Sequence, residues 1–146
     1  STVALIEGGL KAYIFAYLSK MNIVGAAGGQ FWQSPQTLRE TFRRQCAKKV
    51  VLFPDAGSVT NRCVLLDYFR TLKLIHQWGM DIMIAWWGQA DKHANLDADD
   101  YLKSEPGVSA ADILQLSVSD FWKKVPDGVR MELLRGKHAQ IFSWFA

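Results

Sequence analysis

The amino-acid sequence predicts an α/β fold, with a four-stranded parallel sheet in the strand order 2-1-3-4 and helices on both faces. Short apolar runs alternate along the chain with stretches of helical periodicity, which is typical of a parallel sheet. Two of the runs end on a carboxylate followed by glycine, at Glu7-Gly8-Gly9 and Asp55-Ala56-Gly57. Strands one and three must be neighbours for these acids to meet, which gives the predicted order and a switch point between them.

The four expected strands are short and apolar, as strands buried on both faces are. They cover residues 3–7, 22–27, 50–53 and 81–87. Apolar residues recur at helical spacing in the intervening residues 10–20, 34–48 and 61–78. Ser34-Pro35 is a favourable start for the second of these helices, and Gly79 a favourable end for the third.

The last third of the chain is predicted to be helical. We expect one domain over residues 1–103 and, over residues 104–146, a helical C-terminal extension packed on it. A short helical turn is expected at residues 97–103, and further short helices at residues 109–112, 117–124 and 129–134. The aromatic residues near the C-terminus are expected to cover one face of the sheet or a neighbouring domain.

Composition bounds the function only loosely. The chain of 146 residues fits one domain, and its formal net charge of +3 does not by itself indicate a nucleic-acid binder. Cys46 and Cys63 are far apart and form no Cys-x-x-Cys pair, which excludes a cysteine zinc site and predicts reduced, partly buried thiols. Reduced thiols favour a cytoplasmic protein. No apolar run approaches membrane-spanning length, so we expect no membrane partner. A start at Ser1-Thr2 favours a domain taken from a longer protein.

Acidic residues follow three of the predicted strands. They are Glu7, Asp55 and the group Asp97, Asp99 and Asp100. Taken singly, each has an ordinary explanation. Glu7 could be a helix-capping acid, Asp55 part of an Asx turn, and the third group an acidic helix N-terminus. Taken together at one edge of a sheet, they predict a Mg²⁺ or Mn²⁺ site, because Mg²⁺ prefers a few carboxylates with water and substrate phosphate.

Three segments carry a resemblance to a known family. They are Leu5-Ile6-Glu7-Gly8-Gly9-Leu10-Lys11-Ala12, Phe53-Pro54-Asp55-Ala56-Gly57 and Leu96-Asp97-Ala98-Asp99-Asp100-Tyr101-Leu102. Together they resemble a Toprim domain, the Rossmann-like catalytic module of bacterial-type primases, type IA and type II topoisomerases and some nucleases. The closest likeness is to Toprim-like domains of uncharacterised replication proteins from cyanobacteria, plasmids and phages. The resemblance covers residues 3–103.

The resemblance implies roles for the matched residues. Glu7 corresponds to the family's glutamate, proposed as a general acid or base, and Lys11, one helical turn later, would contact phosphate or pair with Glu7. Asp55 corresponds to the first Asp of an Asp-x-Asp metal motif, in which Gly57 replaces the second. Asp97, Asp99 and Asp100 match the third motif and would supply the remaining metal ligands.

A basic stretch in the second predicted helix is a candidate nucleic-acid contact. It contains Arg39, Arg43, Arg44 and Lys48, which share helix faces in pairs. The alternative is an ordinary solvated helix face. Phe31 and Trp32, just before it, could stack on bases or fill the core.

Two functions of different classes follow. The first is a Mg²⁺-dependent Toprim-type domain of a DNA replication protein, acting in primase-like phosphoryl transfer on single-stranded DNA or RNA beside other domains such as a helicase. The second is a degenerate Toprim-like module that binds nucleic acid or a partner protein without catalysis, which Gly57 favours. A flavodoxin-like nucleotide-binding domain is less favoured, because the chain has neither Gly-x-Gly-x-x-Gly nor a P-loop.

Overall fold

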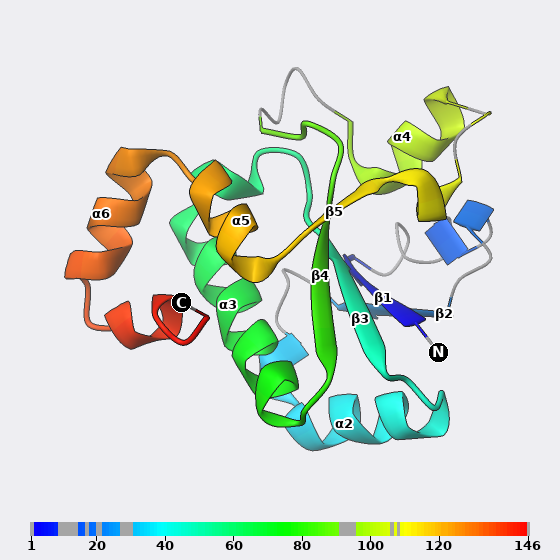
Figure 1. The fold of residues 1–146 in the computed structure, drawn as a ribbon, viewed down its shortest axis with the longest axis horizontal. Coiled ribbons are helices and arrows are strands. Elements are labelled where there is room, and N and C mark those ends of the chain that lie inside the picture. Colours follow the sequence, from blue (N-terminus) through cyan, green and yellow to red (C-terminus); the bar gives the residue numbers. More distant parts are fainter. Residues whose placement is uncertain are drawn as a thin grey trace.

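The structure, a computed structural model, has the α/β architecture that the sequence predicts (Figure 1). It describes residues 2–8, 15–16, 18–19, 22–26, 31–90, 96–105, 107 and 109–145. A mixed sheet of five strands, in the order β2-β1-β3-β4-β5, forms its centre. Most of the predicted helix over residues 10–20, Lys11 included, lies outside the described residues.

The first four strands of the sheet are parallel. They are β1 (Thr2–Glu7), β2 (Asn22–Ala26), β3 (Lys49–Phe53) and β4 (Asp81–Trp86). β1 lies between β2 and β3, so the chain moves to one side of β1 and then to the other. Pairing of Ile6 with Phe53 aligns the carboxyl ends of β1 and β3, and this alignment brings the residues that follow the two strands to one place.

The sheet differs from the predicted one in a fifth strand, β5 (Leu114–Leu116), antiparallel to β4. The segment 104–146 is therefore not purely helical. Three residues are too few to show a period of two, and the strand exists because β4 offers an unpaired edge. In addition, the Nζ of Lys49 in β3 donates a hydrogen bond of 2.8 Å to the side chain of Gln115 in β5.

The described helices lie close to their predicted positions. They are α2 (Pro35–Arg44), α3 (Arg62–Gln77), α4 (Ala98–Ser104), α5 (Val118–Lys124) and α6 (Asp127–Arg135), with 3₁₀ turns η2 (Phe31–Gln33), η3 (Ser58–Thr60), η4 (Ala110–Asp112) and η5 (Ala139–Phe142). Asn61 caps α3 by accepting a hydrogen bond from the Val64 N–H. No helix in the described ranges is both long and apolar enough to cross a membrane.

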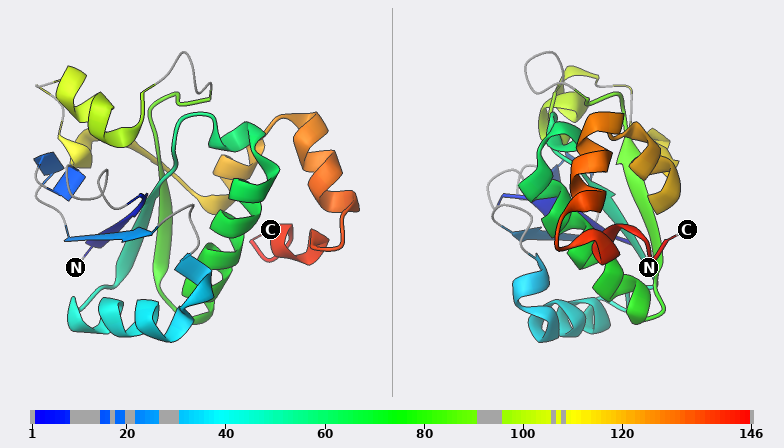
Figure 2. Two further views of the ribbon diagram at one scale, coloured as in Figure 1. Left: turned by 180° about the vertical axis from the view of Figure 1, so that it is seen from behind. Right: turned by 90° about the vertical axis from the view of Figure 1, so that its left-hand side faces the viewer.

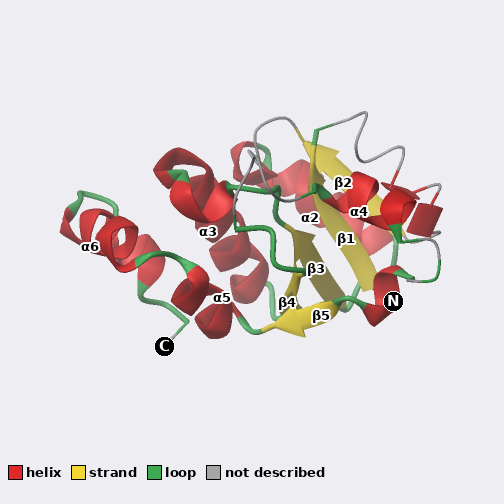
Figure 3. Ribbon diagram, turned by 90° about the horizontal axis from the view of Figure 1, so that it is seen from above, coloured by secondary structure: helices red, strands yellow, loops and turns green. Residues whose placement is uncertain are grey.

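Two hydrophobic clusters cover the two faces of the sheet, and Figures 2 and 3 show the helices that lie around it. Alternate strand residues supply them, with Val3 and Leu5 on one face and Ala4 and Ile6 on the other. Helices α2, α3 and α5 pack on the first face, and α4 with Phe15 on the second. The central strands β1 and β3 are therefore buried on both faces along most of their length, and the residues that follow them are the ones that reach solvent.

The C-terminal aromatic residues surround Phe69 of α3 and belong to the hydrophobic cluster on one face of the sheet, as expected. Phe121, Trp122, Phe142 and Phe145 have ring centroids 5.2–6.1 Å from that of Phe69. Figure 2 shows the C-terminal segment folded back against α3. This contact holds η5 beside the middle of the helix.

The cysteines are more accessible than the sequence suggested. Cys46 and Cys63 are both exposed and neither is in a disulfide. Cys46 lies in the turn after α2 with φ of 52°, and Cys63 in the first turn of α3. Both lie at helix ends, where the apolar periodicity of a helix interior does not determine burial.

Candidate functional site

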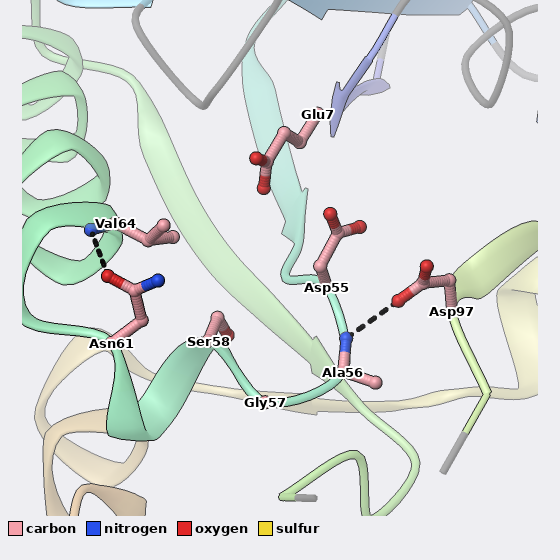
Figure 4. A pocket seen from close by; sticks show the side chains of 8 residues that line it. All are labelled: Glu7, Asp55, Ala56, Gly57, Ser58, Asn61, Val64 and Asp97. Atoms are coloured by element: carbon pink, nitrogen blue, oxygen red, sulfur yellow. Dashed lines mark hydrogen bonds between the residues drawn. The ribbon is translucent and has the colours of Figure 1, made fainter. Parts of the chain in front are cut away.

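A pocket of about 160 Å³ opens at the carboxyl ends of β1 and β3 (Figure 4). Three carboxylates from separate segments line it: Glu7, Asp55 and Asp97. The rest of its wall comes from the β3–α3 connection and the start of α3, namely Ala56, Gly57, Ser58, Asn61 and Val64. We call this the acidic pocket.

Glu7 and Asp55 reach the acidic pocket because their strands end there. Glu7 is the last residue of β1 and is followed by Gly8 with φ of 88°. Asp55 comes two residues after the end of β3, behind the buried Pro54. Gly57 then turns the chain into η3 with φ of 81°. This left-handed conformation is open to glycine and unfavourable for most side chains, which gives Gly57 a structural reason to replace an aspartate.

Tyr68 of α3 joins the ends of β1 and β3. Its hydroxyl donates a hydrogen bond of 2.9 Å to the Glu7 Oε2 and accepts one of 3.3 Å from the Asp55 N–H. The side chain is 1% exposed. Burial, followed by the nearby carboxylates of Glu7 and Asp55, raises the pKa of Tyr68 well above its usual value. The phenol therefore stays protonated and remains a donor to Glu7.

Asp97 is held from the other side of the acidic pocket. Its Oδ1 accepts a hydrogen bond of 2.8 Å from the Ala56 N–H. Its neighbours Leu96 and Tyr101 contact Trp87, whose Nε1 donates to the Leu96 carbonyl and whose ring stacks on Tyr101 of α4 at 5.7 Å. Residue 97 is thus brought to the end of β3 by contacts with the end of β4.

Gln89 supports the pocket from behind and was not anticipated from the sequence. It is fully buried, and its amide nitrogen donates to the carbonyls of Pro54 and Ala85. Its backbone carbonyl accepts the Gly57 N–H at 3.2 Å. A single glutamine after a strand gives no sequence signal for this role, because its partners come from two different strand ends.

Asp99 and Asp100 lie on α4 outside the wall of the acidic pocket. Asp99 is 7% exposed, and within the described residues its Oδ1 has no hydrogen-bond partner. Asp100 is exposed. Of the three acids in the third motif, the structure therefore places only Asp97 beside Glu7 and Asp55.

The chemistry of the acidic pocket suits a hard cation, but its geometry is not that of a closed metal site. In the part of the chain that the structure describes, no group of three or more His, Cys, Asp or Glu side chains is arranged to hold a metal ion. Carboxylate oxygens are nevertheless the ligands that Mg²⁺ prefers, and Mg²⁺ commonly uses one or two of them with water and phosphate. The residues fit a cation that is shared with a ligand phosphate.

The basic residues of α2 lie near the amino-terminal end of β3, whereas the acidic pocket lies at its carboxyl end. α2 ends at Arg44, shortly before β3 begins, whereas the pocket lies past the end of β3 (Figure 1). A five-residue strand separates the two places by about 16 Å. Arg43 and Arg44 both pair with Glu40, at 3.1 and 3.5 Å. α2 therefore does not place these arginines beside the acidic pocket.

The remaining predicted contacts divide between surface and core. The Arg39 guanidinium lies over the Trp78 ring at 5.7 Å from its centroid, and Lys48 is exposed in the turn before β3. Phe31 is buried in the core at 5% exposure, so it cannot stack on a base. Trp32 is only partly buried.

Comparison of the chain with protein-family models, with curated proteins and with solved structures finds no match. The fold and the acidic pocket therefore carry the functional argument. They define an α/β domain with three carboxylates at a switch point of its sheet, the place where ligands bind in open α/β folds.

Proposed function

We propose that the chain is a Toprim-like domain of a DNA replication protein and acts in Mg²⁺-dependent, primase-like phosphoryl transfer on nucleic acid. The observation that carries this proposal is the meeting of Glu7, Asp55 and Asp97 in one pocket. These residues come from all three segments that resemble Toprim motifs.

The sheet supports the Toprim-like assignment. Its parallel strands follow the order β2-β1-β3-β4, and the first two motifs come at the ends of the adjacent strands β1 and β3. The third motif begins α4, after β4. β5 is an addition at the edge and lies away from the switch point.

The protein side chains would hold the cation only in part. Asp55 and Asp97 are the proposed protein ligands, and a nucleic-acid phosphate would complete the coordination. The cation, when bound, would neutralise charge that develops on the transferred phosphoryl group. This arrangement agrees with a pocket that three carboxylates line but in which, among the described residues, no three acids are arranged to hold a metal ion by themselves, and it makes metal binding dependent on the nucleic acid.

Glu7 is the proposed proton acceptor. The hydrogen bond from Tyr68 fixes one of its carboxylate oxygens, Oε2, and leaves Oε1 for a hydroxyl group of the substrate. The Ala56 N–H similarly orients Asp97. These two hydrogen bonds come from groups that are themselves fixed in the fold, so the two carboxylates keep their positions before a ligand arrives.

The experiment measures Mg²⁺ and Mn²⁺ binding by calorimetry, with and without a single-stranded oligonucleotide. We expect weak binding to the protein alone and at least about tenfold tighter binding when the oligonucleotide is present, because the phosphate supplies ligands. Asp55→Asn should abolish the calorimetric heat of metal binding. Asp120 is an exposed acid on α5, and Asp120→Asn should preserve this heat.

Activity is tested as Mg²⁺-dependent nucleotide addition or strand cleavage by the chain and by a longer protein that contains it. Glu7→Gln should lower the rate by about 10²–10⁴-fold, the usual share of general acid–base catalysis. Unchanged activity in Glu7→Gln would exclude the proposed role of Glu7. A metal affinity that changes neither in Asp55→Asn nor on addition of the oligonucleotide would exclude the proposed metal site.

A second candidate is a Toprim-like module that binds nucleic acid or a protein without catalysis. Gly57 at the position of the second metal aspartate and the lack of a three-acid metal group in the described residues both favour it. The calorimetry separates the two candidates. If the chain binds the oligonucleotide but shows no heat of metal binding at millimolar Mg²⁺ and Mn²⁺, it is the non-catalytic module.

A further inference from the structure

A second pocket, of about 330 Å³, lies beside the middle of α3, and we propose that it binds one nucleotide unit by its base and its phosphate. Arg70 and Lys73 supply its charge, and Trp32, Pro35, Leu74 and Ile141 supply most of its apolar wall. We call it the basic pocket. These residues come from η2, α2, α3 and η5, so the pocket exists only in the folded chain.

The charge of the basic pocket is positive and is not neutralised within the described part of the chain. Arg70 and Lys73 are one turn apart on α3, both half-buried, and neither forms an ion pair with a carboxylate there. Asp67, one turn before Arg70, instead accepts a hydrogen bond of 2.8 Å from the Trp32 Nε1. Two adjacent cations, neither paired with a carboxylate among the described residues, favour an anionic ligand, and a phosphate fits both.

The guanidinium of Arg70 is held in place before any ligand binds. Its Cζ lies 4.6 Å from the centroid of the Trp32 ring, and its Nη2 lies 3.3 Å from the ring nitrogens of His138. A guanidinium fixed between two rings loses little freedom when it binds phosphate or stacks on a base. This pre-organisation distinguishes Arg70 from a solvated surface arginine.

The shape and lining favour a nucleotide over other anions. The volume is near the lower end of the range of about 300–1,000 Å³ for small-molecule sites, which is enough for a base, a sugar and a phosphate. Leu74 and Ile141 offer an apolar surface to a planar group, beside the Arg70 guanidinium on which bases stack. Free phosphate would use only the cations, and a peptide or a lipid surface would need a longer groove or a flat face.

This inference does not depend on the acidic pocket. Within α3, Val64 faces the acidic pocket whereas Arg70, Lys73 and Leu74 face the basic one, and no metal is needed for binding to the latter. The test is therefore made in EDTA. Failure of nucleotide binding in EDTA would leave the metal experiment unaffected, and the reverse also holds.

In the experiment, the full chain is titrated with thymidylate and with a short oligodeoxythymidylate, in EDTA at low salt, and binding is measured by calorimetry. We expect saturable binding of at least one of them, and the tighter of the two identifies a free nucleotide or a strand as the ligand. Lys73→Glu should weaken binding by about tenfold or more, the loss of one charge-assisted phosphate contact. Lys73→Met, which keeps the chain length, should weaken it in the same direction.

Lys123→Glu is the matched control, because it makes the same charge change at an exposed position on α5. It should change the affinity by less than about twofold, since distant exposed charges are screened. The proposal is overturned if neither probe saturates, if folded Lys73→Glu and Lys73→Met bind like the parent chain, or if Lys123→Glu loses as much. Equal or tighter binding of inorganic phosphate, a phosphopeptide or anionic vesicles overturns it as well.

Discussion

The acidic and basic pockets share the helix α3 but are built in different ways. The acidic pocket gathers residues that follow strand ends, and hydrogen bonds from Tyr68 and Ala56 fix two of its carboxylates. The basic pocket gathers residues from helical segments, and stacking of Arg70 on Trp32 fixes its charge. The division falls within α3, where Tyr68 contacts Glu7 of the acidic pocket and Arg70, two residues later, lines the basic pocket.

The difference shows how secondary structure controls what a site depends on. The acidic pocket rests on strand pairing, which the hydrophobic sheet core enforces along the whole of β1 and β3. The basic pocket rests on the docking of η5 against α3. A variant can therefore disturb one pocket and spare the other, and the following predictions use this independence.

The largest expected effect is that of Phe69→Ala. Phe69 is fully buried and contacts four aromatic rings of the C-terminal segment. Its removal should lower the free energy of unfolding by about 3–5 kcal/mol, measured by urea titration. Thymidylate binding should weaken, because Phe69 holds η5 in place and Ile141 of η5 lines the basic pocket. The heat of metal binding at the acidic pocket should persist. Leu134→Ala, at a residue 49% exposed on α6, should cost less than about 0.5 kcal/mol.

Tyr68→Phe should disturb the acidic pocket with a smaller loss of stability. The phenyl ring keeps the packing, but the Glu7 carboxylate and the Asp55 N–H each lose their partner at the hydroxyl. We expect a loss of about 1–3 kcal/mol with unchanged thymidylate binding. A variant as stable as the parent chain would show that the hydroxyl does not join the ends of β1 and β3.

The Tyr68 phenol also predicts a pH dependence. Its pKa in the folded chain is raised above the unfolded value of 10.0, so above about pH 10 the unfolded chain loses this proton while the folded chain keeps it. The contribution is present below pH 10, and the free energy of unfolding should fall by up to about 1.4 kcal/mol per pH unit above it. The comparison is with Tyr68→Phe, whose curve should lack this component. Parallel curves would contradict the raised pKa.

The smallest expected effect compares two helix caps. Asn61 caps α3 with its side chain at the wall of the acidic pocket, whereas Ser34 at the start of α2 makes no side-chain cap bond. Asn61→Ala should cost about 1 kcal/mol by thermal or urea unfolding, and Ser34→Ala clearly less. Equal losses would show that the Asn61 cap bond contributes nothing beyond the preference of its residue type.

Much of the fold was predictable because its signals are local. The strands at Thr2–Glu7 and Lys49–Phe53 are apolar runs, and α3 has a capping residue, an apolar stripe and a terminal glycine. β5 was not predictable, because three residues become a strand only through the free edge of β4. The same applies to Gln89, whose partners lie at the ends of two strands.

The candidate site was predictable to the same degree. Glu7 and Asp55 follow strands, so their meeting follows from strand order. The position of Asp97, rather than Asp99 or Asp100, in the pocket did not, because it depends on the contacts of Asp97 with Ala56 and of Leu96 with Trp87. The basic residues of α2 were recognised as a group, but their distance from the acids depends on the direction of β3.

The sequence by itself determined an α/β chain that places carboxylates after two adjacent strands. Periodicity and strand ends are properties of short segments, and a parallel sheet converts them into position. The tertiary structure decided the rest: Tyr68 as the link between Glu7 and Asp55, Asp97 as the third acid, and Arg70 and Lys73 in a pocket to which η5 contributes Ile141. These contacts join residues distant in the chain, and only the packing of helices on the sheet brings them together.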